Sequence, residues 1–234
     1  MTCAHGRTQN HGSLGLPWHT FLLLTVVLAL YVFGGPAPEA LVFDRQAIMH
    51  GELWRLFTCH WVHGDLEHLV WNLAAFVILG WMIETSICPS RLYIALLAGM
   101  CVVDICVWWF IPTLDLYCGL SGILNTLLFL VLIDGWLKSR NIVFPLVIVA
   151  AIAKIAFEMV TSSAIFTHTI WPSVPDAHLA GALAAVLAVN YRGILTRGIY
   201  VWRQLRHKRT SRTDRSSHSS AQNTTRINPS NEFI

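Results

Sequence analysis

Six apolar stretches, separated by short polar segments, constrain this chain more than any other feature of its sequence. They cover approximately residues 18–34, 68–83, 92–111, 120–136, 142–161 and 177–190. A helix needs roughly 20 apolar residues to cross a bilayer, and the flanks can add a turn to the shorter stretches. Hydrophobic residues make up 55% of the chain and charged residues only 12%, which is too apolar for one soluble core of this length. We therefore expect an all-α polytopic membrane protein with a bundle of six transmembrane helices.

The distribution of Lys and Arg indicates how this bundle crosses the membrane. Cytoplasmic loops carry an excess of these residues. With the N-terminus inside, the inside segments hold Arg7, Arg91, Lys138, Arg140 and the tail from Arg192, and the outside segments hold Arg45 and Arg55. We therefore expect both termini in the cytoplasm, and the second, fourth and sixth helices to run from outside to inside.

The composition divides the chain into three segments. Residues 1–17 form a cytoplasmic N-terminus, residues 18–191 the helical domain, and residues 192–234 a basic tail rich in Ser and Thr. We interpret the first apolar stretch as a retained helix, because the Pro-broken segment 34–38 is a poor signal-peptide cleavage site. The tail is expected to be largely disordered, near anionic lipid. The first outer loop, residues 35–67, is apolar enough to pack on the bundle or in the interface.

Polar residues gather at the start of the second, fourth and sixth stretches. His68 and Asn72 lie four residues apart and so share a helix face, Ser121 lies in the Gly-Leu-Ser-Gly motif of residues 119–122, and His178 begins the sixth helix. Because these helices all start on the outer side, their first turns lie at one depth. A serine hydroxyl needs a base to take its proton, and His is the usual base at neutral pH. The pattern predicts a serine hydrolase with Ser121 as nucleophile and His178 as its base.

Acyl transfer also needs hydrogen-bond donors aimed at the developing oxyanion. We expect the side chains of His68 and Asn72 to supply two of them. The backbone N–H groups of Ser121 and Leu120 can supply others, because the first amides of a helix have no intrahelical partner.

Small residues are expected to pack around these groups. The residues in question are Gly119, Gly122 and Gly181. The first two flank Ser121 and let backbone come close to it. The third belongs to a ridge with Ala177 and Ala185 at a spacing of four residues. Such a ridge allows tight packing on a neighbouring helix, here the one at 120–136, and this packing would bring the histidine to the serine.

Each of these elements alone has a structural explanation. Gly-x-Ser-Gly is typical of helix packing, a His at a helix start is typical of the interface, and His-x3-Asn is typical of an interhelical hydrogen bond. Their matching depth in one chain favours the catalytic interpretation. His60, His63 and His68 with Asp65 and Glu67 also suggest a metal site, but the spacing is not His-Glu-x-x-His and no second cluster completes a coordination shell. We expect no metal, no cofactor and no nucleic-acid partner.

Two pairs of residues leave alternatives open. Lys154 and Glu158 lie one helical turn apart and are expected to form an ion pair that lowers the cost of two charges in lipid. The alternative is a contribution to recognition of a substrate tail. Asp176 precedes His178 by two residues and is expected to cap the last helix. The alternative is that it orients the histidine as a third catalytic residue.

Other polar residues are less informative. Asp104 is expected to be buried if its helix is central, with a partner that sequence does not identify. Cys59 and Cys118 fall in two outer loops, and spacing does not decide whether they form a disulfide.

Taken together, residues 50–190 resemble the rhomboid family of intramembrane serine proteases. The matching positions are Gly51-Glu52-Leu53-Trp54-Arg55-Leu56-Phe57-Thr58, His63, His68, Asn72, Gly80, Glu84, Gly119-Leu120-Ser121-Gly122 and Ala177-His178-x2-Gly181. The resemblance implies a Ser/His dyad with no third acid, in a water-filled cavity that opens outward. It also implies that Trp54 and Arg55 lie in a hairpin structure of the first loop, and that substrates are membrane-anchored proteins cleaved in or near a transmembrane segment.

The rhombosortase subgroup looks most similar. The chain has a six-span core with no seventh helix, Leu rather than Ala before the serine in segment 117–124, and a Lys-Ile-Ala-Phe-Glu segment at 154–158. Asn125 departs from the subgroup, which often has His there. This resemblance implies cleavage of C-terminal Gly-Gly-type sorting tails and a place in the bacterial inner membrane, with the active site opening to the periplasm.

Three other functions remain as alternatives. One is a general rhomboid protease with other membrane substrates, and a second is a non-catalytic rhomboid-like protein that binds membrane clients. The third, a small transporter or channel, predicts polar residues near mid-membrane on several helices, whereas here only Asp104 is clearly deep. The sequence does not indicate the oligomeric state.

Overall fold

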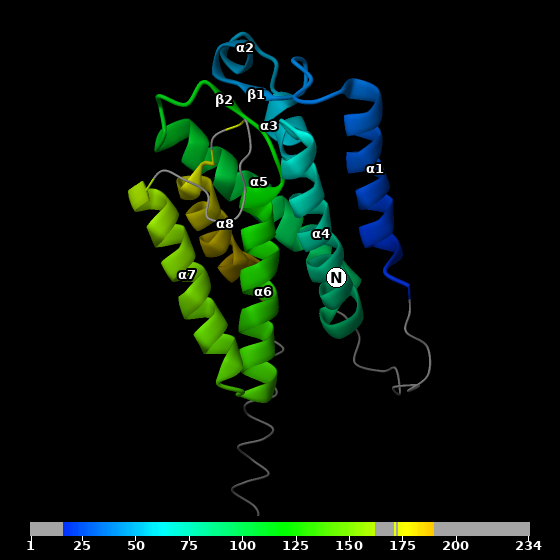
Figure 1. The fold of residues 1–234 in the computed structure, drawn as a ribbon, viewed down its shortest axis with the longest axis vertical. Helices are drawn as coiled ribbons and strands as arrows, with labels where there is room; N and C mark the ends of the chain where they lie inside the picture. Colours follow the sequence, from blue (N-terminus) through cyan, green and yellow to red (C-terminus); the bar gives the residue numbers. More distant parts are fainter. Residues whose placement is uncertain (1–15, 162–170, 172, 190–234) are drawn as a thin grey trace, which may run out of the picture. The chain divides into compact units, whose positions relative to one another are not determined.

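The described part of the chain is mostly helical (Figure 1). A computed structural model describes residues 16–161, 171 and 173–189. The principal helices are α1 (Trp18–Gly34), α4 (Leu66–Met82), α5 (Pro89–Trp109), α6 (Ser121–Ser139), α7 (Val143–Thr161) and α8 (Pro175–Ala188). Four segments are long and apolar enough to cross a membrane, namely α4 with its extension, α5, α6 and α7, while α1 and α8 are shorter apolar helices. The predicted all-α membrane bundle is confirmed; the predicted disordered tail lies outside the described residues.

Three helices begin earlier than the apolar pattern predicts, each for a local reason. α5 begins at Pro89, three residues early, because proline suits the first helical position. α4 begins two residues early because Asp65 caps it, its carboxylate accepting the backbone N–H of His68 at 2.7 Å. α8 begins at Pro175, whose fixed φ suits the first helical position. The prediction that Asp176 caps this helix is therefore wrong. Asp176 lies in the first turn, and the capping position before Pro175 carries no side-chain hydrogen bond.

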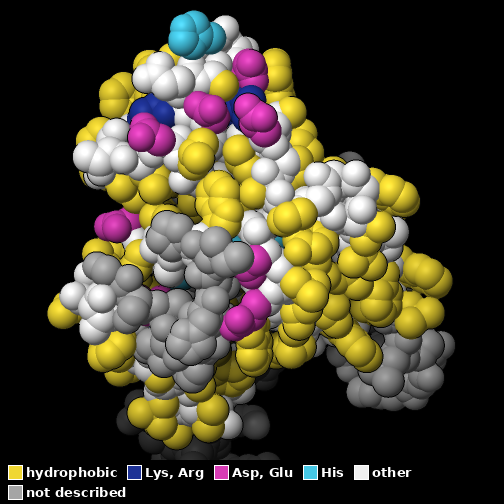
Figure 2. All heavy atoms as spheres, turned by 45° about the horizontal axis from the view of Figure 1, so that its top comes forward, with side chains coloured by type: hydrophobic (Ala, Val, Ile, Leu, Met, Phe, Trp, Pro, Cys, Tyr) yellow, Lys and Arg dark blue, Asp and Glu magenta, His cyan; other side chains and the backbone are white. Residues whose placement is uncertain are grey.

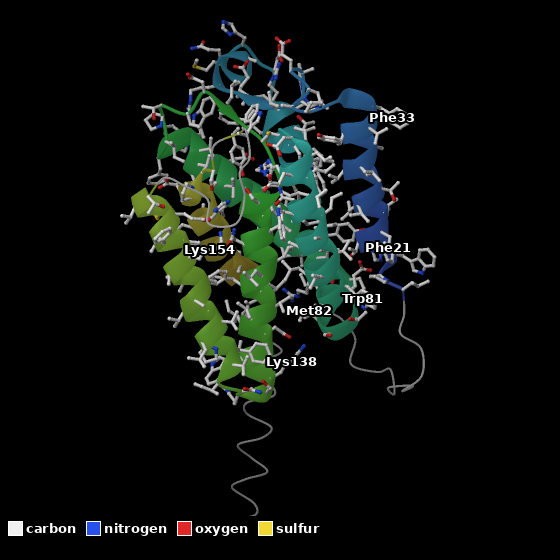
Figure 3. All side chains as sticks on the ribbon, in the orientation of Figure 1. Phe21, Phe33, Trp81, Met82, Lys138 and Lys154 are labelled. Atoms are coloured by element: carbon white, nitrogen blue, oxygen red, sulfur yellow. The ribbon has the colours of Figure 1, made fainter. Side chains whose placement is uncertain are left out.

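The helices alternate in direction, so α4, α6 and α8 all begin at the end of the bundle that the first loop covers (Figure 1). Basic residues gather at the opposite end, where Figure 3 labels Lys138 on α6. Lys138 donates to the carbonyl of Ser86 at 2.8 Å, and Arg91 donates to the carbonyl of Ala188 at 2.9 Å. That second contact places a positive charge at the C-terminus of α8, which the helix dipole favours. Arg91 and Lys138 thus share one end of the bundle, as the charge-based topology requires.

The first loop folds into short elements over the start of the bundle. These are β1 (Phe43–Asp44), α2 (Arg45–Met49), α3 (Arg55–Thr58) and the 3₁₀ turn η1 (Cys59–Trp61). β1 pairs antiparallel with β2 (Leu116–Tyr117) from the second outer loop, with Phe43 opposite Tyr117. Phe43 and Ile48 are buried against Val103 of α5 and Ala177 of α8. The loop therefore packs on the bundle, and Figure 2 shows most charged side chains gathered over it while hydrophobic side chains cover much of the visible surface below.

Arg55 fixes the shape of this loop from within. Its side chain is buried, and it donates to the carbonyls of Val42 at 3.0 Å and Glu39 and to the carboxylate of Glu52 at 2.7 Å. Trp54 beside it is exposed and donates through its indole N–H to Ala40. A buried guanidinium needs such partners to offset its loss of water. Both residues therefore organise the first loop, as the family resemblance implies.

α1 is anchored to α4 through a polar contact. The carboxylate of Glu84, in the π-helical extension η2 (Ile83–Ile87) of α4, accepts the backbone N–H groups of His19 at 3.2 Å and Thr20 at 2.5 Å. Gly80 leaves room for this contact, since a Cβ there would lie 2.4 Å from the Thr20 hydroxyl. The two amides belong to the first turn of α1 and have no intrahelical partners of their own.

α6 and α8 cross in close backbone contact. A Cβ built on Gly181 would lie 1.8 Å from the carbonyl oxygen of Gly122, and one built on Gly122 would lie 3.3 Å from the carbonyl oxygen of Ala177. The Thr126 hydroxyl donates to the Gly181 carbonyl at 2.8 Å. Ala177, Gly181 and Ala185 are all buried. This small-residue ridge of α8 thus packs on the helix that carries the serine motif.

Gly181→Ala is expected to push α6 and α8 apart. The added methyl group meets backbone, which cannot move without displacing a helix, and overpacking of this kind costs about 1–3 kcal/mol. The unfolding temperature in detergent, followed by tryptophan fluorescence, should fall by several degrees. Leu183→Ala is the control, because Leu183 is on the same helix and 61% exposed. An unchanged unfolding temperature for Gly181→Ala would contradict the close crossing.

Candidate active site

Ser121 is the first residue of α6 and follows a turn that contains Gly119. Gly119 has a φ of +115°, a conformation that favours glycine, and its N–H donates to the carbonyl of Cys59 at 2.9 Å. Leu120 occupies the capping position without a side-chain hydrogen bond. The Ser121 side chain is half-buried, and its hydroxyl has no hydrogen-bond partner among the described residues. The turn therefore places the Ser121 hydroxyl, without a partner among the described residues, at the N-terminus of α6.

His178 lies in the first turn of α8, beside the crossing of α6 and α8. It is 8% exposed, and the carbonyl of the preceding Ala177 packs against Gly122, the residue after the serine. The crossing thus brings the two predicted catalytic residues into one layer. Nδ1 of His178 lies 3.3 Å from a carboxylate oxygen of Glu158. Within the described ranges no hydrogen bond joins the Ser121 hydroxyl to His178, and catalytic hydrogen bonds often tighten only when substrate is bound.

α4 carries the two side chains predicted as oxyanion donors, His68 and Asn72. The His68 imidazole lies against Gly119, because a Cβ on that glycine would be 2.5 Å from Cε1 and 2.7 Å from Nε2. His68 is also close enough to His178 for their charges to interact. Asn72 follows one turn later and is buried. The structure therefore places His68 at the turn that carries the serine, with Asn72 one helical turn further along the same face of α4.

Two buried polar side-chain atoms on α4 and two backbone amides at the start of α6 have no partner within the described residues. Asn72 Nδ2 and His68 Nδ1 make no hydrogen bond with any described residue. The backbone N–H groups of Leu120 and Ser121 open a helix and so lack intrahelical acceptors. A buried donor without a partner costs free energy, commonly about 1–3 kcal/mol. An anionic oxygen placed beside Ser121 would give such donors an acceptor.

His63 packs against His68 and is buried. The two imidazole centroids are 5.0 Å apart. Burial, together with the neighbouring His68, lowers the pKa of His63 to about 3. Burial also raises the pKa of Tyr117 well above its usual value. His63 is therefore neutral at physiological pH.

Lys154 and Glu158 form the predicted ion pair on α7. Lys154 Nζ lies 2.7 Å from Oε1 of Glu158, and Figure 3 labels Lys154 on the side of α7 that turns toward α6. The second carboxylate oxygen is the one at His178. Sequence reasoning considered Asp176 as an acid for the histidine, but the structure places Glu158 at Nδ1. The sequence carried one signal for this contact. Glu158 lies near the outer end of an outward-running helix and therefore at a depth similar to that of His178.

Asp104 has a partner that the sequence did not reveal. Its carboxylate lies 3.0 Å from Nε2 of His60, which is fully buried. Their ligand atoms and the thiol of Cys59 lie within 4.8 Å of one another, so this trio, rather than the histidine cluster of the first loop, is the group with metal-binding geometry in the described residues. Cys59 and Cys118 are free thiols, and burial raises the pKa of Cys118 to about 12. The disulfide that spacing left open is not formed.

Comparison with known proteins matches the chain to a known domain and to a short part of a relative. The rhomboid domain matches residues 50–193, which is more than half of the chain. RHOMBOID-like protein 5 of Arabidopsis thaliana is 37% identical over 41 residues, which are 18% of this chain and 13% of that protein. The chain thus matches only a small part of that relative's length. The matched domain includes the turn at Ser121, the histidines of α4 and α8, and the crossing between α6 and α8.

His63 should make the free energy of unfolding depend on pH. Below its usual pKa of about 6.5, the unfolded chain binds a proton that the folded chain excludes until about pH 3. Stability should therefore fall by up to about 1.4 kcal/mol per pH unit as the pH drops below 6.5. His63→Phe removes this contribution, so its unfolding free energy should fall less steeply between pH 6.5 and 4.5. Equilibrium unfolding in detergent measures the slope.

His50→Phe is the matched control for this experiment, because His50 is exposed on the first loop and should keep the wild-type slope. Equal slopes for wild type and His63→Phe would show that His63 is protonated in the folded protein.

Proposed function

The chain belongs to the rhomboid family, and we propose that it is an intramembrane serine endopeptidase in which Ser121 is the nucleophile and His178 the general base. One observation carries this proposal. The glycine crossing of α6 and α8 holds the first turns of both helices together, at the end of the bundle where α4 supplies unpartnered donors. Each motif alone could serve packing, but packing does not require a free hydroxyl, a buried imidazole and orphan donors around one turn.

The proposed reaction follows from the free atoms of the site. Nδ1 of His178 is engaged with Glu158, so Nε2 is the nitrogen available to accept the proton of the Ser121 hydroxyl. The serine oxygen then attacks the scissile carbonyl, whose oxygen becomes anionic. Collapse of this intermediate breaks the C–N bond, and the proton on Nε2 passes to the leaving amine. Water, deprotonated by the same nitrogen, hydrolyses the acyl-enzyme and restores the serine.

The oxyanion in this reaction would be held by donors that have no acceptor in the free enzyme. Asn72 Nδ2 is buried and unpartnered, and the imidazole of His68 lies at Gly119, two residues from the nucleophile. The backbone N–H groups of Ser121 and Leu120 complete the set. Donors that are already in place need no reorganisation as the negative charge develops, which is why such sites contribute strongly to rate.

The proposed setting is a bacterial inner membrane with the site facing the periplasm. Arg91 and Lys138 at the far end of the bundle support a cytoplasmic location for that end. The substrates are then membrane-anchored proteins, cleaved in or next to a transmembrane segment. The narrower proposal, C-terminal sorting tails of the Gly-Gly type, is supported by the rhombosortase-like segments 117–124 and 154–158.

Ser121→Ala should abolish cleavage of a membrane-anchored substrate and labelling by a fluorophosphonate, because both require the serine oxygen as nucleophile. Purified protein in detergent or liposomes is incubated with a tailed substrate and, separately, with the probe. Ser139→Ala is the control, since this exposed serine ends the same helix at the opposite end. Cleavage by Ser121→Ala at the wild-type rate would refute the mechanism.

The same assay separates the alternative functions. A client-binding protein would bind substrate without cleaving it and would not be labelled at Ser121. A general rhomboid protease would cleave equally well whether or not the substrate tail carries the Gly-Gly motif.

Asn72→Ala should lower kcat by about 10²–10³-fold, the usual cost of removing one oxyanion donor, while KM changes little. Initial rates over a range of substrate concentrations give both constants. Asn141→Ala, a similar truncation at the opposite end of α6, should keep the wild-type kcat. An Asn72 variant with raised KM and unchanged kcat would assign this residue to substrate binding instead.

A further inference from the structure

Glu158 occupies a position that neither packing nor an ion pair with Lys154 explains. Its carboxylate is 1% exposed and contacts groups on two helices. Oε1 accepts from Nζ of Lys154 on its own helix at 2.7 Å, and Oε2 lies 3.3 Å from Nδ1 of His178 on α8. A pair needed only to neutralise two charges in lipid has no need of the proposed catalytic base.

Ionisable groups inside a membrane are costly and tend to mark functional sites. Lys154 and Glu158 lie within an apolar helix that is itself a candidate span. Lys154 Nζ lies 2.7 Å from Oε1 and so balances the negative charge of an ionised Glu158. An ionised carboxylate can accept a hydrogen bond from an imidazole N–H but cannot donate one. A neutral His178 that donates to this carboxylate carries its proton on Nδ1.

This arrangement has a direct consequence for the base. With the proton on Nδ1, the lone pair of Nε2 is free, and the ring is fixed in one orientation. When Nε2 takes the proton of Ser121, the resulting imidazolium lies beside a carboxylate, which stabilises it. The proton on Nδ1 stays on the histidine throughout, as it does in Ser-His-Asp triads.

We propose that Glu158, held by Lys154, is a positioning residue for His178, so that serine, histidine and glutamate act together in this chain. This inference rests on the proposed function of Ser121 and His178. It departs from the Ser/His dyad that the family resemblance implies, and it assigns the orienting acid to α7 rather than to Asp176 of α8.

The test compares Glu158→Gln with wild type in the cleavage assay. The amide keeps the size of the side chain but removes its charge and can favour the wrong tautomer. We expect kcat to fall by about 10²–10⁴-fold, by analogy with loss of the acid in serine proteases, and KM to stay within about threefold. Glu158→Asp, which keeps the charge on a shorter arm, should recover part of this loss.

A pH profile separates positioning from mere structural support. Among the described residues, the titratable groups near His178 are Glu158 from α7 and His68 from α4, and Lys154 contacts the other oxygen of the Glu158 carboxylate. Loss of the negative charge makes the imidazolium less stable, so the acid limb of kcat/KM in Glu158→Gln should move to lower pH. A variant that was only less well folded would keep the wild-type profile at reduced amplitude.

Glu84→Gln is the matched control, because it neutralises the carboxylate that anchors α1, away from His178. It should keep the wild-type pH profile and a kcat close to wild type. The unfolding temperature of each variant is measured alongside.

The outcomes distinguish this inference from the proposed function. If Ser121→Ala is inactive while Glu158→Gln keeps the wild-type kcat and pH profile, the serine mechanism stands and the role of Glu158 is refuted. If Glu158→Gln raises KM alone, the residue contacts substrate and the inference is also refuted. If Ser121→Ala is active, the proposed function is refuted, whatever the result for Glu158→Gln. A large loss of kcat with a shifted acid limb and partial recovery by Glu158→Asp supports the inference.

Discussion

The contact between Gly122 on α6 and Gly181 on α8 is the constraint on which the rest of the site depends. The two backbones approach so closely that a methyl group on Gly181 would overlap the Gly122 carbonyl. Thr126 adds a hydrogen bond to the carbonyl of Gly181 at the same crossing. In a bilayer, helices gain little by burying apolar side chains against each other, so close backbone contact and such hydrogen bonds hold them together. Because Ser121 and His178 lie beside the crossing, this packing also sets the geometry of the site.

Polar groups in the bundle fall into two classes. Most of those described are paired, among them Arg55 with loop carbonyls, Asp104 with His60, and Glu158 with Lys154 and His178. A buried polar group without a partner is costly, so these pairs maintain the fold in an apolar setting. Among the described residues, the buried polar atoms without a partner belong to His60, Trp61, His63, His68, Asn72 and Tyr117. Of these residues, His68 lies directly against Gly119 of the serine turn, where a developing negative charge could use a donor.

Much of this arrangement could be predicted from the sequence, but the predictions failed where two distant segments meet. The helices, the shared end of Arg91 and Lys138, and the Lys154–Glu158 pair follow from local patterns and charge counting. The β1–β2 ribbon did not, because two-residue strands carry no periodic signal. The cap predicted at Asp176 was wrong because the helix starts at Pro175, which makes Val174 the capping residue. The partner of Asp104 depended on the path of the first loop across the bundle.

The sequence by itself determined the membrane class, the helix directions and the common depth of Ser121, His178, His68 and Asn72. Hydropathy and the Lys and Arg bias are sums over many residues, so they survive without knowledge of contacts. Only the tertiary structure decided which acid meets the histidine. Depth alone allowed an acid on either α7 or α8, and the choice of Glu158 depends on the rotation of α7 about its axis and its distance from α8. Side-chain packing sets both of these, and no local pattern in the sequence encodes them.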